Sequence, residues 1–239
     1  MEVIEVFKEL NIADNSEALI DELVGAISLD PVSIKNLAKK TGNAPLYFRD
    51  AWYWAKLKGF IYGVKDIQDN LGEGVSISTK LFGSDKDKKR NGTRLLAELE
   101  KIDTAEKMGY VLNATKSLLM GLIDNSLYFR LIDVIVDMLP EDLEYFSSIA
   151  ITTCTYSGSL QINTLQRKGL LMQAGVDANA DIEKQENIVT ELGRKLDCYA
   201  LSLDNEEHWK WHKEHDETSA GNYSVAPNIA VEGDILKLF

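Results

Sequence analysis

Apolar side chains recur every three or four positions along much of this chain, which is the pattern of amphipathic helices. The most regular stripe lies within residues 103–123 and comprises Met108, Val111, Leu112, Leu118, Leu119, Leu122 and Ile123. Asp103 can cap this predicted helix, and Glu106 would complete a capping box. Residues 93–102 predict the helix before it, whereas residues 83–92 are bounded by glycine and lack apolar side chains. We expect residues 83–92 to form a solvated loop.

Three further helices are predicted in the second half of the chain. Residues 126–139 are apolar on most faces, which indicates a buried helix. A second helix begins at Pro140, because proline suits the first helical position. A third covers residues 157–169 and ends at Gly169, since a left-handed helix end favours glycine. The side chains expected to face inward from this third helix are Leu160, Ile162 and Leu165.

Two short strands and a closing helix follow. Residues 170–175 and 187–189 are apolar enough for strands and flank a polar excursion, and Thr190 is the expected N-cap of the last helix. The predicted order of elements is that of a winged-helix domain: three helices, a strand, a polar excursion, a second strand and a closing helix. The motif "LQRKGLL…NIVTELGRKL" resembles the recognition-helix end, wing and closing helix of bacterial regulators of the MarR and PadR type. The resemblance implies that residues 157–168 correspond to a recognition helix.

A looser copy of the same order is predicted in the first half. Residues 33–42 resemble the second helix of a helix-turn-helix, and residues 45–59 would be its third helix. A strand at 60–64, a wing at 65–74 and a returning strand at 75–78 complete the comparison. Repetition in the same order indicates one architecture used twice.

These patterns predict a mainly α fold with small β-hairpins (α+β), built as tandem winged-helix domains joined by helices. The expected parts are a winged-helix-like domain at 1–83, a basic loop with connecting helices at 84–125, a winged-helix domain at 126–203, and a polar His/Trp segment with the C-terminal tail at 204–239.

Composition is that of a globular chain, with 45% hydrophobic and 27% charged residues. The 38 acidic and 26 basic residues give a net charge of −12. Such a surface repels phosphate backbones and anionic lipids, which disfavours general binding to nucleic acid or membranes. No basic start precedes an apolar run, and no apolar stretch is long enough to span a membrane. We expect Cys154 and Cys198 to be reduced core thiols in a cytoplasmic protein.

All three histidines, His208, His212 and His215, lie within residues 206–215. In a helix, either neighbouring pair shares a face and could place two imidazoles on a Zn²⁺, Ni²⁺ or Cu²⁺ ion. The outer two would be about 10 Å apart along the axis, and the order HExxH is absent. We therefore expect no metal, but a solvated helix end with Trp209 packed inward and its lysines in water.

Two groups of residues are candidate binding surfaces. Aromatic side chains crowd residues 47–54 beyond what one inward helical face can hold, so some should contact a partner or a second domain. The candidates there are Arg49, Trp52, Tyr53 and Trp54. The predicted recognition helix carries side chains of the types that contact base edges and phosphates, namely Ser159, Gln161, Asn163, Gln166, Arg167 and Lys168. The wing that follows opposes DNA binding, because it carries the carboxylates Asp177, Asp181, Glu183 and Glu186.

The sequence lacks a phosphate-binding glycine loop and a nucleophile elbow, so we expect neither an enzyme nor a cofactor. The favoured interpretation is a non-catalytic winged-helix adaptor or inhibitor that binds another protein through an acidic surface. The first alternative is a transcriptional regulator of the MarR or PadR type that binds duplex DNA as a homodimer. The second is a metal-dependent or thiol enzyme, in which Cys154 or Cys198 would act with His208.

Overall fold

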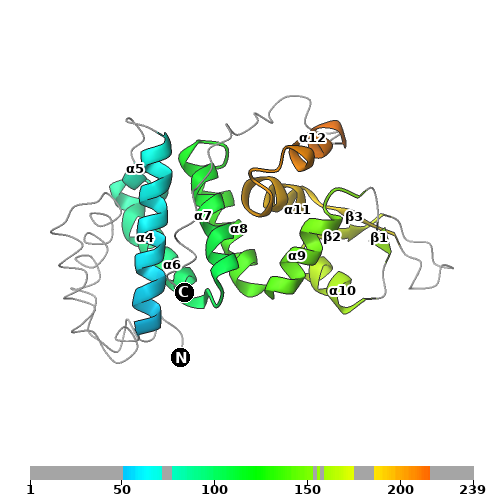
Figure 1. Ribbon diagram of the computed structural model, residues 1–239, viewed down its shortest axis with the longest axis horizontal. Coiled ribbons are helices and arrows are strands. Elements are labelled where there is room, and N and C mark those ends of the chain that lie inside the picture. The colour runs from blue at the N-terminus through cyan, green and yellow to red at the C-terminus, as the bar shows by residue number, and fades with distance from the viewer. Residues whose placement is uncertain (1–50, 72–76, 153–154, 157–158, 175–185, 216–239) are drawn as a thin grey trace. The chain divides into compact units, whose positions relative to one another are not determined.

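The computed structural model describes residues 51–71, 77–152, 155–156, 159–174 and 186–215. Over these residues the fold is mainly helical with a small antiparallel sheet, as the α+β prediction requires (Figure 1). The described residues up to Ile132 belong to one compact unit, and those from Asp133 onward belong to a second. None of the helices in this part of the chain combines the length and the apolar character that a membrane crossing needs.

The described residues of the first unit form helices. They are α4 (Ala51–Leu71), α5 (Ile77–Phe82), α6 (Asp85–Lys101), α7 (Ala105–Leu119) and the first turns of α8 (Asn125–Asp137). Two lysines connect helices to the C-terminal carbonyl groups of their neighbours. Lys56 Nζ donates to the Glu100 carbonyl at 2.8 Å, and Lys80 Nζ donates to the Leu119 carbonyl at 2.6 Å. An ammonium group is stabilised there, because the last carbonyls of a helix carry a partial negative charge.

The β-hairpin predicted for the first half is wrong. Residues 60–64, predicted as a strand, lie within the continuous helix α4, which runs on through the first part of the predicted wing to Leu71. Ile77 and Ser78, predicted to be in the returning strand, begin α5. The physical reason is the spacing of the buried residues, which recur at helical intervals as Leu57, Phe60, Ile61, Val64 and Ile67. Residues 1–50 and 72–76 lie outside the described part of the chain.

The loop predicted at 83–92 is also wrong, because α6 begins at Asp85. The interruption between α5 and α6 consists of Gly83, whose φ of 78° suits glycine, and the N-cap Ser84. Charged side chains then stabilise the first turns, since Asp87 accepts from Ser84 Oγ at 2.8 Å and pairs with Arg90 at 2.9 Å. Asn91 is buried and donates to the Phe82 carbonyl at 3.0 Å. A polar, glycine-bounded sequence can thus start a helix when its charges lie three positions apart.

Helix α7 confirms the predicted stripe up to Leu119, with a shift at its start, whereas the predicted continuation of the helix to residue 123 is wrong, because the helix ends before Gly121, whose φ is 78°. Thr104 is the N-cap and its hydroxyl accepts from the Lys107 amide at 3.3 Å, whereas Asp103, the predicted cap, pairs with Lys107 Nζ at 2.9 Å. The stripe is buried from Met108 to Ile123 except at Leu122, which is half-buried.

The second unit contains the predicted elements in their predicted order, with one additional strand between the second and third helices. After α8 come α9 (Pro140–Ile149), β1 (Thr155–Tyr156), α10 (Leu160–Arg167), β2 (Leu171–Gln173), β3 (Glu186–Val189), α11 (Glu191–Leu196), the π-helical turn η2 (Asp197–Leu201) and α12 (Glu206–His215). The strands lie in the order β1-β3-β2, and β3 is antiparallel to both neighbours. The strand β1 was not predicted, because two residues carry no detectable period.

Predicted details of this unit hold with one exception. Pro140 occupies the start of α9, and Gly169 has a φ of 72° at the end of α10. Ile162 and Leu165 are buried as expected, but Leu160 is 77% exposed, so the prediction that it faces inward is wrong. It is the first residue of α10 and directly follows the N-cap Ser159.

Thr190 and Gly193 join the strand pair to α11. The Thr190 hydroxyl donates to the Gly169 carbonyl at 2.6 Å and accepts from the Gly193 amide at 3.0 Å. A Cβ atom on Gly193 would lie 2.5 Å from the Leu170 carbonyl oxygen and 3.0 Å from Phe146. Glycine is therefore required where α11 crosses the end of β2, which explains the glycine of the "TELG" motif.

Replacing Gly193 with alanine should lower the free energy of unfolding by about 1–3 kcal/mol, because backbone must move to admit the methyl group. Gly109→Ala is the matched control. It lies inside α7 with no atom within 4 Å of the added carbon, and it should stabilise by about 0.5–1 kcal/mol. Urea denaturation of both variants measures the two effects. Equal effects at the two positions would show that the close approach at Gly193 is wrong.

Candidate functional site

The predicted recognition helix α10 uses part of its polar surface to hold the fold together. Ser159 caps the helix by accepting from the Ile162 amide at 3.1 Å. The Gln166 amide donates to Asn187, a fully buried residue of β3. Lys168 pairs with Asp137 of α8 at 3.0 Å. Three of the six predicted contact residues of this helix therefore have partners within the second unit.

The remaining predicted residues of α10 are available at its surface. Asn163 and Arg167 are exposed, and Gln161 is half-buried. Arg167 contacts its own helix, donating to the Asn163 carbonyl at 3.4 Å and to the Thr164 hydroxyl at 3.5 Å. Both contacts are long, so the guanidinium group is held weakly and remains accessible.

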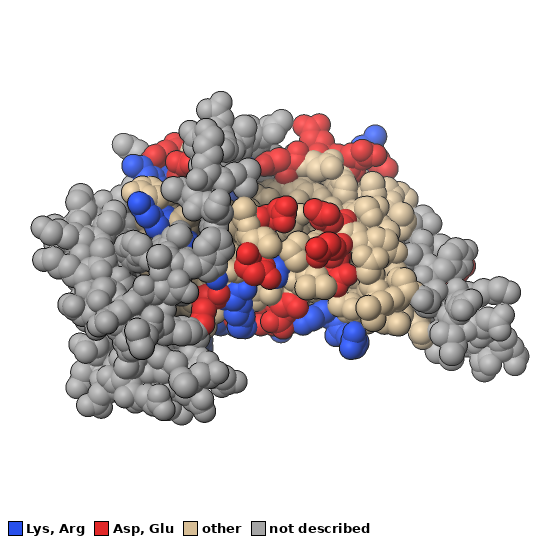
Figure 2. All heavy atoms as spheres, turned by 60° about the horizontal axis from the view of Figure 1, so that its bottom comes forward, with Lys and Arg blue, Asp and Glu red and all other residues tan. Residues whose placement is uncertain are grey.

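Acidic side chains line the helices that precede α10. The exposed acidic residues of α8 and α9 within the second unit are Asp133, Asp137, Glu141 and Glu144. In Figure 2, acidic side chains are exposed over the visible part of the described surface, with basic side chains among them. Leu139 lies between these two pairs in sequence and is 62% exposed. This surface therefore offers negative charge together with an apolar side chain.

The other predicted surface has no described contacts. Arg49 lies outside the described part of the chain. Trp52, Tyr53 and Trp54 belong to α4, but their side chains are likewise outside what the structure describes. Their assignment to a partner surface stays a prediction, as does the role assigned to the wing carboxylates between 177 and 183.

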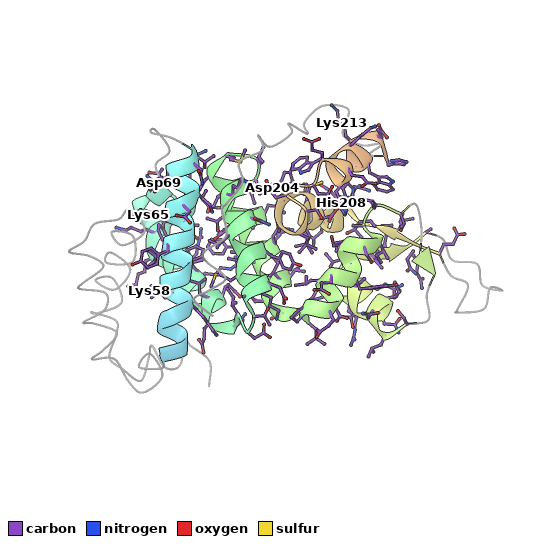
Figure 3. The ribbon with its side chains drawn as sticks, in the orientation of Figure 1. Lys58, Lys65, Asp69, Asp204, His208 and Lys213 are labelled. Atoms are coloured by element: carbon purple, nitrogen blue, oxygen red, sulfur yellow. The ribbon has the colours of Figure 1, made fainter. Side chains whose placement is uncertain are left out.

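Helix α12 is held on η2 by buried histidines. Its buried residues are His208, Trp209 and His212. His208 Nδ1 lies 2.7 Å and His212 Nε2 lies 2.8 Å from the same oxygen, Oδ2 of Asp197. Figure 3 shows His208 on the side of α12 toward η2, while Lys213 points away. The prediction that these two histidines are solvated is therefore wrong. The predictions that Trp209 packs inward and that the lysines of α12 lie in water are confirmed.

The Asp197 carboxylate is shielded from solvent on every side, with a side-chain exposure of 0%. Its second oxygen, Oδ1, accepts from Ser202 Oγ at 2.8 Å and from Ser147 Oγ of α9 at 3.5 Å. Burial by itself raises the pKa of Asp197, but the hydrogen bonds from His208 and His212 outweigh it and hold the pKa below its ordinary value. The carboxylate is therefore ionised and joins α9, η2 and α12.

The two imidazoles differ in the surroundings of the ring nitrogen that does not face Asp197. A carboxylate only accepts, so each histidine must carry a proton on the nitrogen facing Asp197. The hydrogen bond to Asp197 raises the pKa of His208. His212 is fully buried and its Nδ1 has no hydrogen-bond partner. A second proton on His212 would therefore lack an acceptor, whereas His208 is 11% exposed and can hold a positive charge.

Sequence reasoning missed this cluster for a definite reason. The positions of His208, Trp209 and His212 on one helical face follow from their spacing. Their partner Asp197 lies 11 and 15 residues earlier, and no local pattern marks it as buried.

Cys198 does not support the thiol-enzyme alternative. The thiol is fully buried, and burial together with the adjacent Asp197 charge raises its pKa. His208, the base proposed for it, is bonded to Asp197 through Nδ1. Cys154 lies outside the described residues.

Within the described part of the chain, no group of three or more His, Cys, Asp or Glu side chains is arranged to hold a metal ion. His215 is exposed at the end of α12 and stacks on Trp211 at 4.3 Å. Comparisons of the chain with protein-family models, with curated proteins and with solved structures found no match.

Replacing Asp197 with asparagine should lower the free energy of unfolding by about 3 kcal/mol, because the buried imidazoles lose the charge that they face. Asp133→Asn makes the same chemical change on the exposed side of α8 and should alter stability by less than about 0.5 kcal/mol. Thermal and urea unfolding at neutral pH measure both variants. A loss at Asp197 as small as that at Asp133 would contradict the assigned role of the buried carboxylate.

The Cys198 thiol should resist modification in the folded protein, because both its burial and its raised pKa suppress the reactive thiolate. The test uses Cys154→Ser, so that one thiol remains. Its reaction with an aromatic disulfide reagent should be at least about a hundredfold slower than in denaturant. Rapid stoichiometric labelling of the native variant would revive the thiol-enzyme alternative.

Proposed function

We propose that the second unit is a non-catalytic winged-helix module of an adaptor or inhibitor, which binds another protein through its acidic surface. The order of α8, α9, α10, β2, β3 and α11 supports the winged-helix assignment, since it is the order predicted from the sequence. The hydrogen bonds of Thr190 and the packing of Gly193 give the "TELG" motif the structural role that a closing helix needs.

The observation that carries this proposal is how the polar side chains of α10 are used. Ser159, Gln166 and Lys168 all have internal partners, which leaves Arg167 as the exposed cation of this helix. A helix in the major groove needs several free side chains for bases and cations for phosphates. The surface of α10 meets that need poorly.

Charge on the rest of the second unit favours a protein partner over DNA. Its exposed acidic residues, among those described, are Asp133, Asp137, Glu141, Glu144, Glu186, Glu191, Asp204, Glu206, Glu207 and Glu214. The exposed basic residues over the same span are Arg167, Lys210 and Lys213. Such a surface repels a phosphate backbone and attracts a basic protein surface.

Exposed apolar side chains supply the contact area that charge alone does not. Leu139 is 62%, Leu160 is 77% and Met172 is 52% exposed. Protein interfaces combine apolar contacts at the centre with a polar rim, and methionine is enriched among them. A partner with basic groups and a complementary apolar patch fits this description.

Binding of duplex DNA is the second candidate, and one observation favours it. Arg167, Asn163 and Gln161 lie on α10 and are at least partly accessible. Under this alternative, affinity for a selected duplex falls steeply with salt, and Arg167→Ala reduces the slope by about one phosphate contact.

The two candidates are separated by one pair of experiments on the full chain. Affinity capture with chemical crosslinking should retain a protein partner, and reversing two charges of α9 with Glu141→Lys and Glu144→Lys should weaken retention at least about tenfold. The matched control, Asp69→Lys with Glu106→Lys, makes the same charge change on exposed residues of the first unit and should retain the partner. Selection from a random duplex library at low salt should enrich nothing. An enriched duplex with an Arg167-dependent salt slope and no protein partner would overturn the proposal.

A further inference from the structure

Two of the three buried side chains of α12 are imidazoles. His208 and His212 both contact Asp197, while Trp209 packs edge-on to Tyr199 at 5.3 Å and donates its ring N–H to the Leu203 carbonyl at 2.8 Å. The other face of α12 is exposed and charged. The contacts that hold this helix therefore include an aromatic pair, a hydrogen bond from Trp209 and a cluster of ionisable groups.

The cluster balances its charge in one protonation state. With His208 protonated, its positive charge offsets the buried Asp197 carboxylate, and neutral His212 donates through Nε2. If His208 loses its proton, a buried negative charge remains with neutral donors alone, which is unfavourable in a desolvated site. If His212 gains a second proton, the N–H at Nδ1 has no acceptor. Loss of the proton from His208 or gain of a second proton by His212 therefore weakens the attachment of α12.

We propose that Asp197, His208 and His212 form a proton-dependent latch, which holds α12 firmly on η2 while His208 is protonated and loosens the helix when His208 loses its proton. The latch does not depend on the nature of the binding partner. Its release would free the face of α12 that carries Trp209 and uncover Tyr199. An apolar aromatic pair is the kind of surface that protein contacts use.

The direction of the pH effect follows from the two groups whose pKa values shift. The pKa of His208 is raised, so its contribution is fully present below the ordinary histidine value of 6.5 and is lost as pH rises through the raised value. The pKa of Asp197 is lowered, so its contribution is present above the ordinary carboxyl range and is lost as pH falls through the lowered value. Attachment is therefore strongest in mildly acidic solution and weakens toward alkaline pH.

Other charged and polar groups around the cluster do not reverse this direction. Glu207 of α12 adds negative charge near His208 and raises its pKa further. Arg194 of α11 acts on the thiol of Cys198. Ser147 of α9 and Ser202 at the end of η2 contact Asp197 through uncharged hydroxyl groups, which lie 3.1 Å apart.

Amide hydrogen exchange on the full chain tests the latch. Exchange rates of residues 206–215 are corrected for the intrinsic effect of pH, and those of α9 report whether the unit remains folded. Between about pH 6 and pH 8.5, the protection of α12 should fall by about tenfold for each unit by which docking raises the pKa of His208. The protection of α9 should stay constant over that range.

His208→Asn keeps a neutral donor near the position of Nδ1 and removes the charge, so its α12 protection should be low and independent of pH. His215→Asn is the matched control, because His215 is exposed on the same helix and lies outside the cluster. It should behave as the wild type. Constant α12 protection in the wild type, or a pH dependence that persists in His208→Asn, would overturn the proposal.

A second measurement keeps the test decisive if His208→Asn does not fold. The ring signals of the three histidines are titrated by NMR in the wild-type chain, and the midpoint of the His208 signal is compared with the midpoint of the protection loss. The two midpoints should coincide. A loss of protection centred elsewhere would show that His208 does not control α12.

Discussion

The Asp197 carboxylate is the interaction on which the C-terminal part of the second unit depends. It accepts hydrogen bonds from two imidazoles of α12 and from the hydroxyl groups of Ser147 and Ser202 while its side chain is completely shielded from solvent. An ion in that position must be fully paired, because an uncompensated buried charge is costly. Asp197 is the first residue of the π-helical turn η2. Such turns disrupt regular helices and are frequent at functional sites. The attachment of α12 is therefore electrostatic as much as hydrophobic.

The internal contacts of its polar side chains also limit which ligands α10 can bind. Gln166 and Lys168 stabilise the packing of α10 against β3 and α8, respectively. Side chains with such partners are poor candidates for contacts with bases, because binding would first have to break internal hydrogen bonds. The acidic residues of the second unit, with the exposed Leu139 and Leu160, point instead to recognition of a protein.

The sequence predicted those parts of the fold that are specified by local patterns of residues. In the second unit, Gly169, Thr190 and the strands near 171 and 188 were predictable because caps and short apolar runs act on adjacent residues. In the first unit, residues 60–64 are predicted as a strand because their side chains favour strands. They instead form part of helix α4, and their conformation depends on packing against α7 through Gly63. The Asp197 cluster joins residues 11 and 15 positions apart, and no local pattern reveals such a contact.

The protonation of the histidine rings is the most direct measure of this account. Long-range correlation of ring nitrogens and carbon-bound protons distinguishes Nδ1 from Nε2 in each of the three histidines of the intact chain. The account predicts a proton on Nε2 of His212, which faces Asp197, and a His208 that carries protons on both ring nitrogens in mildly acidic solution. A His212 ring with its proton on Nδ1, or a His208 ring that lacks a proton on Nδ1, would contradict the buried carboxylate and its role in holding α12.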